Sequence, residues 1–205
     1  MSSAVTVRVP GKINLQLSVG PLQSNGFHPV ATVFQAVSIF DDVRVSVMDE
    51  PGIHIHSTGK HLDHLPLDHT NLAYKAAEIM VKKFEIPDGI SISLTKEIPL
   101  AGGMAGGSAD AGATIVAIDA LYSLGLKRNE MEQIGAALGA DVPFTISGGT
   151  AIGTGKGENI TPVLSRGSYN WVLALSSSGL STPAVYNECD RLREGLDISK
   201  PHVSD

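Results

Sequence analysis

The sequence has very little cysteine, since Cys189 is the only one among 205 residues. A single cysteine cannot form a disulfide within the chain, so the cysteine content does not point to an oxidising compartment. Apolar residues make up 42% of the sequence and charged residues 18%, a composition typical of a folded domain with a hydrophobic core. At this length the chain can form one large domain or two small ones.

Targeting and membrane-spanning patterns are also missing. The residues after Met1 do not place a basic region before an apolar core, as a signal peptide would. The longest apolar stretch, residues 111–126, contains Asp119 and is too short and too polar to span a bilayer. We therefore expect a cytoplasmic protein with no membrane contact.

Basic residues are scarce. The 15 Lys and Arg stand against 21 Asp and Glu, a net charge of 15 − 21 = −6, and the basic residues form no cluster. Such a chain is poorly suited to binding a nucleic-acid backbone, so we expect no nucleic-acid partner. Any phosphate that it binds would be held by backbone amides and one or two cations. The sequence does not indicate an oligomeric state.

What the sequence does have is period-two alternation in its first half, which predicts half-buried, mostly antiparallel strands. These lie at residues 5–9, 15–19, 43–47 and 90–94, with a polar loop at 20–26. Further strands are expected after Gly148-Gly149 and at 171–175.

Helical spacing follows in four segments, so the order of elements predicts an α+β fold. The expected helices and their boundary residues are 72–80 with Thr70 as cap, 108–124 ending at Gly125, a helix capped by Asn129 with Glu132 three residues on and ending at Gly139, and a last helix capped by Ser181 or Thr182 with Pro183 at its first position.

The most informative segment is the glycine-rich stretch 99–110, which follows a predicted strand and opens a predicted helix. Glycines at positions 102, 103, 106 and 107 let the backbone approach an anion closely and adopt positive φ. The start of the following helix offers free N–H groups and the positive end of its dipole. The alternative is a flexible turn, but four glycines with a hydroxyl at Ser108 favour a phosphate site.

Two common phosphate loops are excluded for this segment. A Walker A loop requires a lysine before the Ser, and here Gly107 precedes Ser108 directly. A Rossmann fingerprint would follow the first strand of a parallel sheet, whereas this loop comes after several strands that are predicted to be antiparallel. A second glycine-rich segment, 153–157, leads into a sequence that does not favour a long helix, so we interpret it as a turn between strands.

The loop resembles the second motif of the GHMP kinases (galactokinase, homoserine kinase, mevalonate kinase and relatives). That motif has Pro, three residues, Gly-Leu-Gly, then small residues and Ser. In this chain Met104 stands for the Leu, Ala105 for the following Gly and Ala109 for a frequent second Ser.

Other segments match the same family in order. Residues 10–15, Pro-Gly-Lys-Ile-Asn-Leu, join the first two predicted strands and resemble the first motif in the form found in diphosphocytidyl-methylerythritol kinases. Gly26-Phe27-His28 resembles their Gly-Tyr-His, residues 138–144 match the segment with the catalytic aspartate, and residues 181–186 resemble a substrate-binding stretch. The family's third, glycine-rich motif is absent, so the chain resembles an incomplete kinase.

The resemblance implies a two-domain α+β kinase fold. Residues 1–165 would form an N-terminal ATP-binding domain similar to a ribosomal protein domain, and residues 166–205 would begin a truncated C-terminal substrate domain. It also implies ATP-dependent phosphorylation of the 2-hydroxyl of 4-diphosphocytidyl-2-C-methyl-D-erythritol, in the non-mevalonate (methylerythritol phosphate) route to isoprenoid precursors. ATP and Mg²⁺ would be required, with the Mg²⁺ ligands unassigned.

The resemblance assigns roles to individual residues. Asp141 would accept the proton of the substrate hydroxyl, with Lys12 neutralising charge and holding that carboxylate ionised. Pro143 would force Val142 out of the helical region and so present Asp141 at a break. The cytidine end would contact Phe27, His28 and Tyr186, and the rest of the substrate Asn14 and Thr182. ATP would contact Pro99, Leu100, Ala101, Gly102, Gly103, Met104, Ala105, Gly106, Gly107, Ser108, Ala109, Asn71 and Lys96.

Alternatives stay open for several residues. Asp141 could cap a helix or turn instead, and Tyr186 could pack in the core, whereas Phe27 lies in a polar loop. His54 and His56 would share a strand face within a histidine-rich segment, but without cysteine or clustered acids a solvated hairpin is favoured over a metal site.

Alternatives also stay open for the function. The chain could be another GHMP kinase of the homoserine or mevalonate type, or a catalytically inactive nucleotide-binding fragment. The likeness of this fold type to a ribosomal protein domain makes nucleic-acid binding a third class, which the net charge of −6 disfavours.

Overall fold

The structure is a computed structural model, and it describes residues 4–60, 62, 65–99, 102–174, 180–196, 198 and 200–203. The described elements alternate between a six-stranded sheet and helices, which confirms the α+β class. In chain order they are β1 (Ala4–Val19), β2 (Val30–Met48), β3 (Ile53–Gly59), α1 (Leu72–Lys83), β4 (Gly89–Lys96), α2 (Gly106–Tyr122), α3 (Arg128–Ala136), α4 (Val142–Ser147), β5 (Thr150–Thr154), β6 (Asn159–Pro162) and α5 (Thr182–Leu192).

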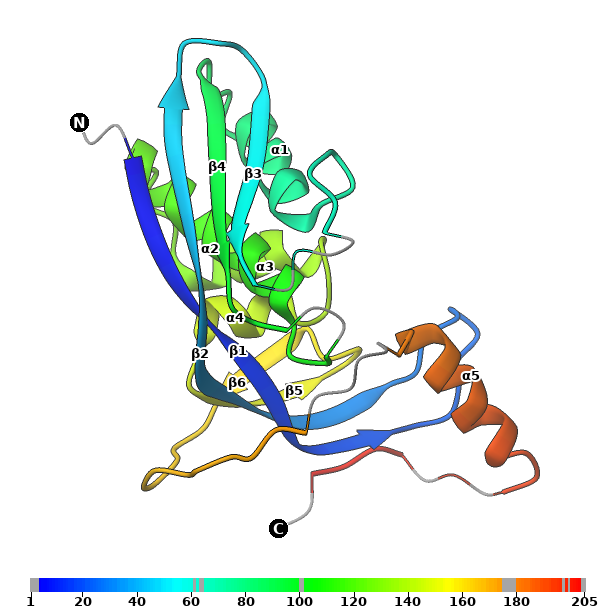
Figure 1. Ribbon diagram of the computed structural model, residues 1–205. Helices are drawn as coiled ribbons and strands as arrows, with labels where there is room; N and C mark the ends of the chain where they lie inside the picture. The colour runs from blue at the N-terminus through cyan, green and yellow to red at the C-terminus, as the bar shows by residue number, and fades with distance from the viewer. Residues whose placement is uncertain are drawn as a thin grey trace.

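The sheet is organised around β2, which is 19 residues long. Its second half pairs with β4, its first half pairs with β5, and β1 pairs along nearly its whole length. The path runs β3-β4-β2-β5-β6, so one strand connects the upper and lower parts of the molecule in Figure 1. The expected antiparallel pairing is found everywhere in this path except between β3 and β4, which run parallel.

The first predicted connection is wrong. Residues 10–15 do not join two strands but lie inside the continuous strand β1. The register against β2 shifts between Pro10 and Lys12 and again between Asn14 and Gln16. A proline cannot donate a hydrogen bond to the ladder, and such irregularities bend a strand and redirect its side chains. Residues 10–15 therefore belong to a single strand whose pairing with β2 is irregular at two places.

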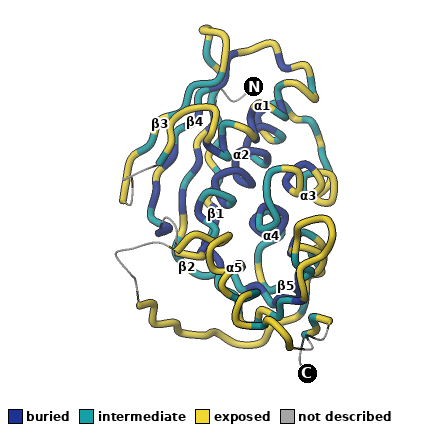
Figure 2. Tube along the Cα trace, turned by 90° about the vertical axis from the view of Figure 1, so that its right-hand side faces the viewer, coloured by how far each residue is buried: buried dark blue, intermediate teal, exposed yellow. Residues whose placement is uncertain are grey.

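Helix α2 lies at the centre of the fold. It packs on β1 and β2 on one side and against α1 and α4 on others, and Figure 2 shows it buried along most of its length. Eleven of its 17 residues are buried, and most of these are alanine or glycine, which let neighbouring backbones approach closely. The alanine-rich composition thus reflects burial on all sides.

The first two helices begin and end at other residues than predicted. Asn71, not Thr70, caps α1, because its Oδ1 accepts a 2.8 Å hydrogen bond from the Ala73 amide. Helix α2 begins at Gly106 and ends at Tyr122, and the left-handed residue that closes it is Ser123, ahead of Gly125.

The third and fourth helices also differ from the prediction. Helix α3 starts two residues earlier than expected, with Lys127 in place of Asn129 as the cap residue. The Glu130 side chain accepts from the Lys127 amide at 2.8 Å, so Asn129 and Glu132 are not the capping pair. The short helix α4 was not predicted. It begins at Val142 and contains Pro143 in its first turn, so the proline does not exclude Val142 from the helix.

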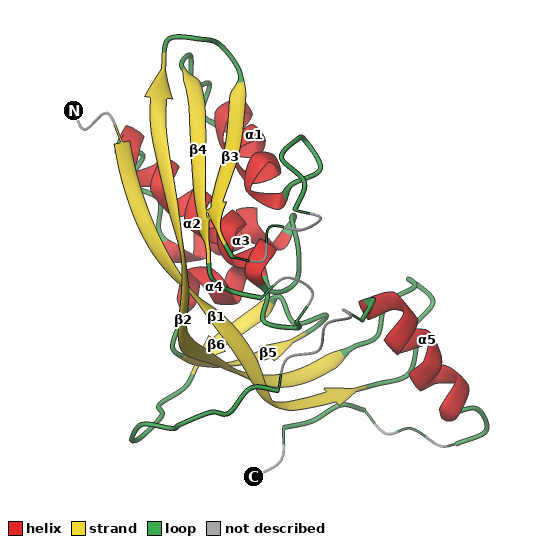
Figure 3. Cartoon of the chain, in the orientation of Figure 1, coloured by secondary structure: helices red, strands yellow, loops and turns green. Residues whose placement is uncertain are grey.

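The C-terminal part is mostly exposed. The predicted strand at 171–175 is wrong for residues 171–174, which have no strand structure, while residue 175 lies outside the described residues. Helix α5 is present, with Ser181 as its cap residue and Pro183 at its second position. It lies beside the loop that joins β1 and β2 (Figures 1 and 3). In the described part of the chain, none of the helices has the length and apolar character needed to cross a membrane.

Candidate active site

Lys12 lies in the irregular segment of β1 and points into the fold, with only 6% of its surface exposed. Its Nζ donates to Asn14 Oδ1 at 2.8 Å and lies 3.6 Å from Asp141 Oδ2. The ring of Phe34, stacked on Phe144, lies beneath the ammonium at 5.4 Å. The cation is therefore held by an amide, a carboxylate and an aromatic face.

Asp141 occupies the position before α4, but its side chain makes no capping hydrogen bond. About a third of that side chain is exposed. The carboxylate consequently has one face toward Lys12 and another toward solvent. This geometry favours a chemical role for Asp141 over the capping alternative.

The glycine-rich loop lies directly beside this pair. The Lys12 amide donates to the Met104 carbonyl at 3.1 Å, which fixes β1 against the loop. Gly103 and Ala105 both have left-handed backbones, with φ of 70° and 59°. Ala105 is the residue before α2, and the helix start has no side-chain cap. The first amides of α2 are therefore available to an anion.

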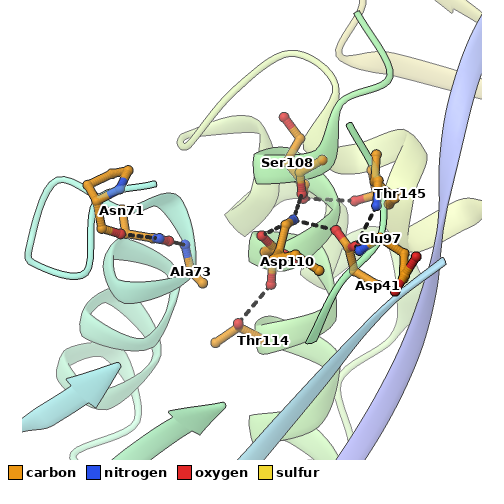
Figure 4. Close-up of polar contacts among 12 residues, drawn as sticks. Asp41, Asn71, Ala73, Glu97, Ser108, Asp110, Thr114 and Thr145 are labelled. Atoms are coloured by element: carbon orange, nitrogen blue, oxygen red, sulfur yellow. Dashed lines mark hydrogen bonds and ion pairs between the residues drawn. The ribbon is translucent and has the colours of Figure 1, made fainter. Parts of the chain in front are cut away.

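The predicted ATP-contacting residues differ in exposure. Gly102 and Gly103 are exposed, Ala105, Gly107 and Ser108 are partly exposed, and Pro99, Met104, Gly106 and Ala109 are buried. The predicted contacts Leu100 and Ala101 lie outside the described residues. The Ser108 carbonyl accepts a 3.2 Å hydrogen bond from Thr145, which joins α2 to α4 (Figure 4).

Asn71 and Lys96 have other partners in the structure. The Asn71 amide caps α1 and donates to the Pro66 carbonyl at 2.7 Å. Lys96 is completely buried and forms ion pairs with Asp41 and Asp110, behind the glycine-rich loop. Both side chains therefore contact protein groups that build the loop's surroundings.

A second group of side chains lies where α5 approaches the loop between β1 and β2. The rings of His28 and Tyr186 are 5.1 Å apart and tilted by 52°. His28 Nδ1 lies 2.9 Å from the Gly20 carbonyl, and its Nε2 lies 3.2 Å from Asp190 Oδ2. Phe27 is half exposed, and the Lys156 ammonium lies 3.5 Å from its ring centroid. Phe27 is thus outside the core, as expected.

Tyr186 connects the two groups. Burial, and after it the nearby charge of Asp141, raises the pKa of the Tyr186 phenol. Asn14 joins Lys12 to β2, since it accepts from Lys12 and donates to Thr32 Oγ1 at 2.7 Å. Thr182 is exposed at the start of α5. Apart from Asn71, Lys96 and Thr182, the described members of the predicted set thus lie at the glycine-rich loop, at the Lys12–Asp141 pair or in the group of His28, Phe27 and Tyr186, called the His28 cluster below.

Sequence reasoning missed several residues of this region. Asp41, Thr32, Asp110, Lys156 and Asp190 each contact a predicted site residue. Two of them stood in segments that the sequence singled out: Asp110 ends the glycine-rich stretch 99–110, and Lys156 lies in segment 153–157, which does form the turn between β5 and β6. No group of three His, Cys, Asp or Glu able to hold a metal occurs among the described residues, and His61 and His64 lie outside them.

Comparisons with known proteins found kinases that are related to this chain in sequence and in fold. Residues 71–149 match the family model described as GHMP kinases N terminal domain. A crystal structure of 4-(cytidine 5'-diphospho)-2C-methyl-D-erythritol kinase superposes with a TM-score of 0.70 at 31% identity, covering 89% of this chain and 63% of that one. Residues 71–149 therefore belong to the family of GHMP kinase N-terminal domains. A homoserine kinase from Cytophaga hutchinsonii shares the fold, with a TM-score of 0.59 at 22% identity over 74% of this chain and 49% of that one.

Curated GHMP kinases resemble the chain along nearly its whole length. The 4-diphosphocytidyl-2-C-methyl-D-erythritol kinase of Paenarthrobacter aurescens is 48% identical, over 96% of this chain and 64% of the relative. The protein of the same name from Mycobacterium tuberculosis H37Rv is 50% identical, over 94% of this chain and 60% of the relative. The chain therefore spans about three fifths of the length of these relatives.

Proposed function

We propose that this GHMP kinase chain serves ATP-dependent phosphorylation of the 2-hydroxyl of 4-diphosphocytidyl-2-C-methyl-D-erythritol. The observation that carries the proposal is the Lys12–Asp141 pair, 3.6 Å apart, beside a glycine-rich loop that opens a helix. Similarity to relatives of that name, at about 50% identity, supports this substrate over homoserine or mevalonate.

Phosphoryl transfer asks the protein mainly for positioning and charge stabilisation. The phosphates of ATP would lie over the loop and the free amides of α2, and Mg²⁺ would arrive with them as part of the nucleotide substrate. Asp141 would accept the hydroxyl proton, since its carboxylate is reachable from solvent and makes no capping bond. Lys12, 3.6 Å from that carboxylate, would neutralise negative charge during the transfer.

The cytidine end would bind at the His28 cluster. Phe27 and Tyr186 offer aromatic faces for stacking, and His28 offers a ring nitrogen to the base edge. Because both nitrogens of His28 face protein acceptors, a bound base would share or replace the Asp190 contact. Asn14, which contacts Lys12, and Thr182, at the exposed start of α5, would contact the rest of the substrate.

We also propose two domains, with residues 1–165 forming the ATP-binding domain and residues 166–205 beginning a substrate domain. Helix α5 supports this division, because none of its residues is buried and Leu180, Val185 and Leu192 expose apolar surface. The relatives are longer than this chain, so their remaining length offers material to cover that surface.

The test is transfer of labelled phosphate from ATP to three acceptors: CDP-methylerythritol, homoserine and mevalonate. It should be run on this chain and on a form extended to the relatives' length. Transfer to CDP-methylerythritol alone supports the proposal, and transfer to another acceptor replaces the substrate. Nucleotide binding without transfer in both forms would leave a nucleotide-binding protein without kinase activity.

A further inference from the structure

Three charged side chains are buried behind the glycine-rich loop. Asp41 comes from β2, Lys96 from the end of β4 and Asp110 from the start of α2, and none exposes more than 1% of its surface. Lys96 Nζ donates to Asp110 Oδ2 at 2.6 Å and also to Asp41 Oδ2. Figure 4 shows Asp41 and Asp110 converging from the strand and the helix. We call these residues the buried triad.

The buried triad holds both ends of the segment that contains the loop. Asp41 Oδ1 accepts from the backbone amides of Glu97 and Ile98, at 2.6 and 2.9 Å, just before the loop. Lys96 Nζ also lies 3.4 Å from the carbonyl of Gly106, the first residue of α2. Displacement of any member would therefore move the amides that face an anion.

The charges of the buried triad do not balance. Two carboxylates share one ammonium, and Asp110 Oδ1 is buried without a hydrogen-bond partner in the described structure. The charged groups that act on Asp110 are Lys96 and Asp41. Three other elements pack against α2 near Asp110. The charged Lys12 of β1 contacts Asn14 and Asp141, α1 contributes the apolar side chains Ala73, Ala76 and Met80, and α4 contributes the hydroxyl of Thr145. Burial, opposed by Lys96 and reinforced by Asp41, raises the pKa of Asp110 to about 7.

A fully ionised triad would place a net negative charge beneath the helix start that receives phosphate. Bound phosphate would then be repelled through a poorly solvated interior, where charges interact more strongly than in water. A proton on the triad removes that charge while the carboxyl stays beside Lys96. Anion binding above and proton binding below must consequently favour one another, because linkage is reciprocal.

We propose that Asp110 is a positioning residue whose carboxyl takes up a proton when nucleotide phosphate binds at the start of α2, so that the buried triad holds the loop without opposing the anion. This inference rests on the proposed ATP site. The chemistry is a proton equilibrium with solvent, so no bond to substrate forms or breaks.

The first experiment does not depend on any ligand. Carbon NMR of the aspartate side chains, assigned by comparison with Asp110→Asn, should show Asp110 titrating near neutral pH in the free protein. Titration of Asp110 in the ordinary range of an exposed aspartate, about pH 4, would overturn the proposal even if nucleotide binds well.

The second experiment is calorimetry of ADP and of a non-hydrolysable ATP analogue in two buffers of different ionisation enthalpy. At about pH 8 the wild type should take up a fraction of a proton more than Asp110→Asn, and the difference should shrink toward about pH 6, where Asp110 is already protonated. Subtracting the variant removes the titration of the nucleotide itself. Asp42→Asn is the matched control, because Asp42 neighbours Asp41 but pairs with the exposed Arg8, and it should take up protons as the wild type does.

The outcomes separate the two proposals. Nucleotide binding with equal proton uptake in wild type and Asp110→Asn rejects the coupling and leaves the ATP site intact. Absence of nucleotide binding rejects the ATP site in this chain and the coupling with it, while the NMR result still decides the state of Asp110. Should Asp110→Asn fail to fold, the buffer dependence of wild type against Asp42→Asn decides: uptake that is absent from both rejects the coupling.

Discussion

The Lys12 ammonium lies 3.6 Å from the Asp141 carboxylate, although Lys12 lies in β1 and Asp141 directly precedes α4, far along the chain. The same lysine is joined to the loop through its backbone amide and the Met104 carbonyl. The pair is therefore fixed relative to the helix start where phosphate would bind. Its two members can be tested separately.

Asp141→Asn should preserve folding and nucleotide affinity and lower kcat by about 10²–10⁴-fold, because an amide cannot accept the hydroxyl proton. Turnover and nucleotide binding are measured side by side in the form with the relatives' length. Asp42→Asn, which removes a partly exposed carboxylate from β2, serves as control. Near wild-type turnover of Asp141→Asn would end the role of Asp141 as base.

Lys12→Met should lower turnover more than it weakens ATP binding. The substitution keeps most of the buried stem beside Phe34 but removes the positive charge that lies 3.6 Å from the Asp141 carboxylate. Steady-state kinetics should give a lower kcat with a smaller change in the Kd of an ATP analogue. Equal losses in both would indicate that Lys12 contacts the nucleotide in the ground state.

Phe27→Ala and His28→Ala should each weaken CDP binding by about 1–3 kcal/mol, the range for base stacking and for a buried polar edge left unpaired. Neither residue touches the glycine-rich loop in the described structure, so the affinity for an ATP analogue should stay the same. Calorimetry of both ligands provides the ratio, and Phe40→Ala, an exposed aromatic on β2, is the control. Unchanged CDP affinity in both variants would place the cytidine pocket elsewhere.

Ala105→Gly should leave the free energy of unfolding unchanged or raise it by up to about 1 kcal/mol, because a left-handed alanine is strained and glycine is not. Ala113→Gly, at a buried interior position of α2, should lower it by about 1 kcal/mol. Urea denaturation compares the two. A similar loss in both variants would contradict the left-handed conformation of Ala105.

The stability of Asp110→Asn relative to wild type should rise with pH. Asp110 has a folded-state pKa of about 7, above the 3.8 of an ordinary aspartate, so the native state holds this proton longer than the unfolded state does. The wild type should therefore lose about 2–3 kcal/mol relative to the variant between about pH 5 and pH 8, with little further change above. Urea denaturation at both pH values measures this, and a constant difference would contradict the raised pKa.

The sequence was most informative where chemistry is local. Four glycines around a predicted helix start predict a phosphate loop from backbone properties alone. A turn with left-handed Gly103 and Ala105 does lead into α2, and phosphate binding there stays a prediction. The period-two pattern located the strands, but it could not show that β1 continues through Pro10, because an irregular pairing depends on the partner strand.

Other features depend on contacts between distant segments. Asp41, Lys96 and Asp110 stand in a strand, a strand end and a helix, where each alone resembles a solvated charge, and only the fold brings them together. The same holds for Asp190 on α5, whose partner His28 lies in the loop between β1 and β2. The prediction of a strand at 171–174 was wrong because this run of apolar residues pairs with no neighbouring strand in the described structure.

Helix α5 supplies Tyr186 and Asp190 to the candidate site, yet none of its own residues is buried. The phosphate side of the site, by contrast, rests on α2 at the centre of the core. Opening α5 away from His28 would break only a few surface contacts, whereas displacing α2, from which the loop leads, would disturb the core of the domain. The side of the site formed by α5 is therefore less rigid than the side formed by α2. The substrate end can adapt its shape, while the nucleotide end keeps a fixed one.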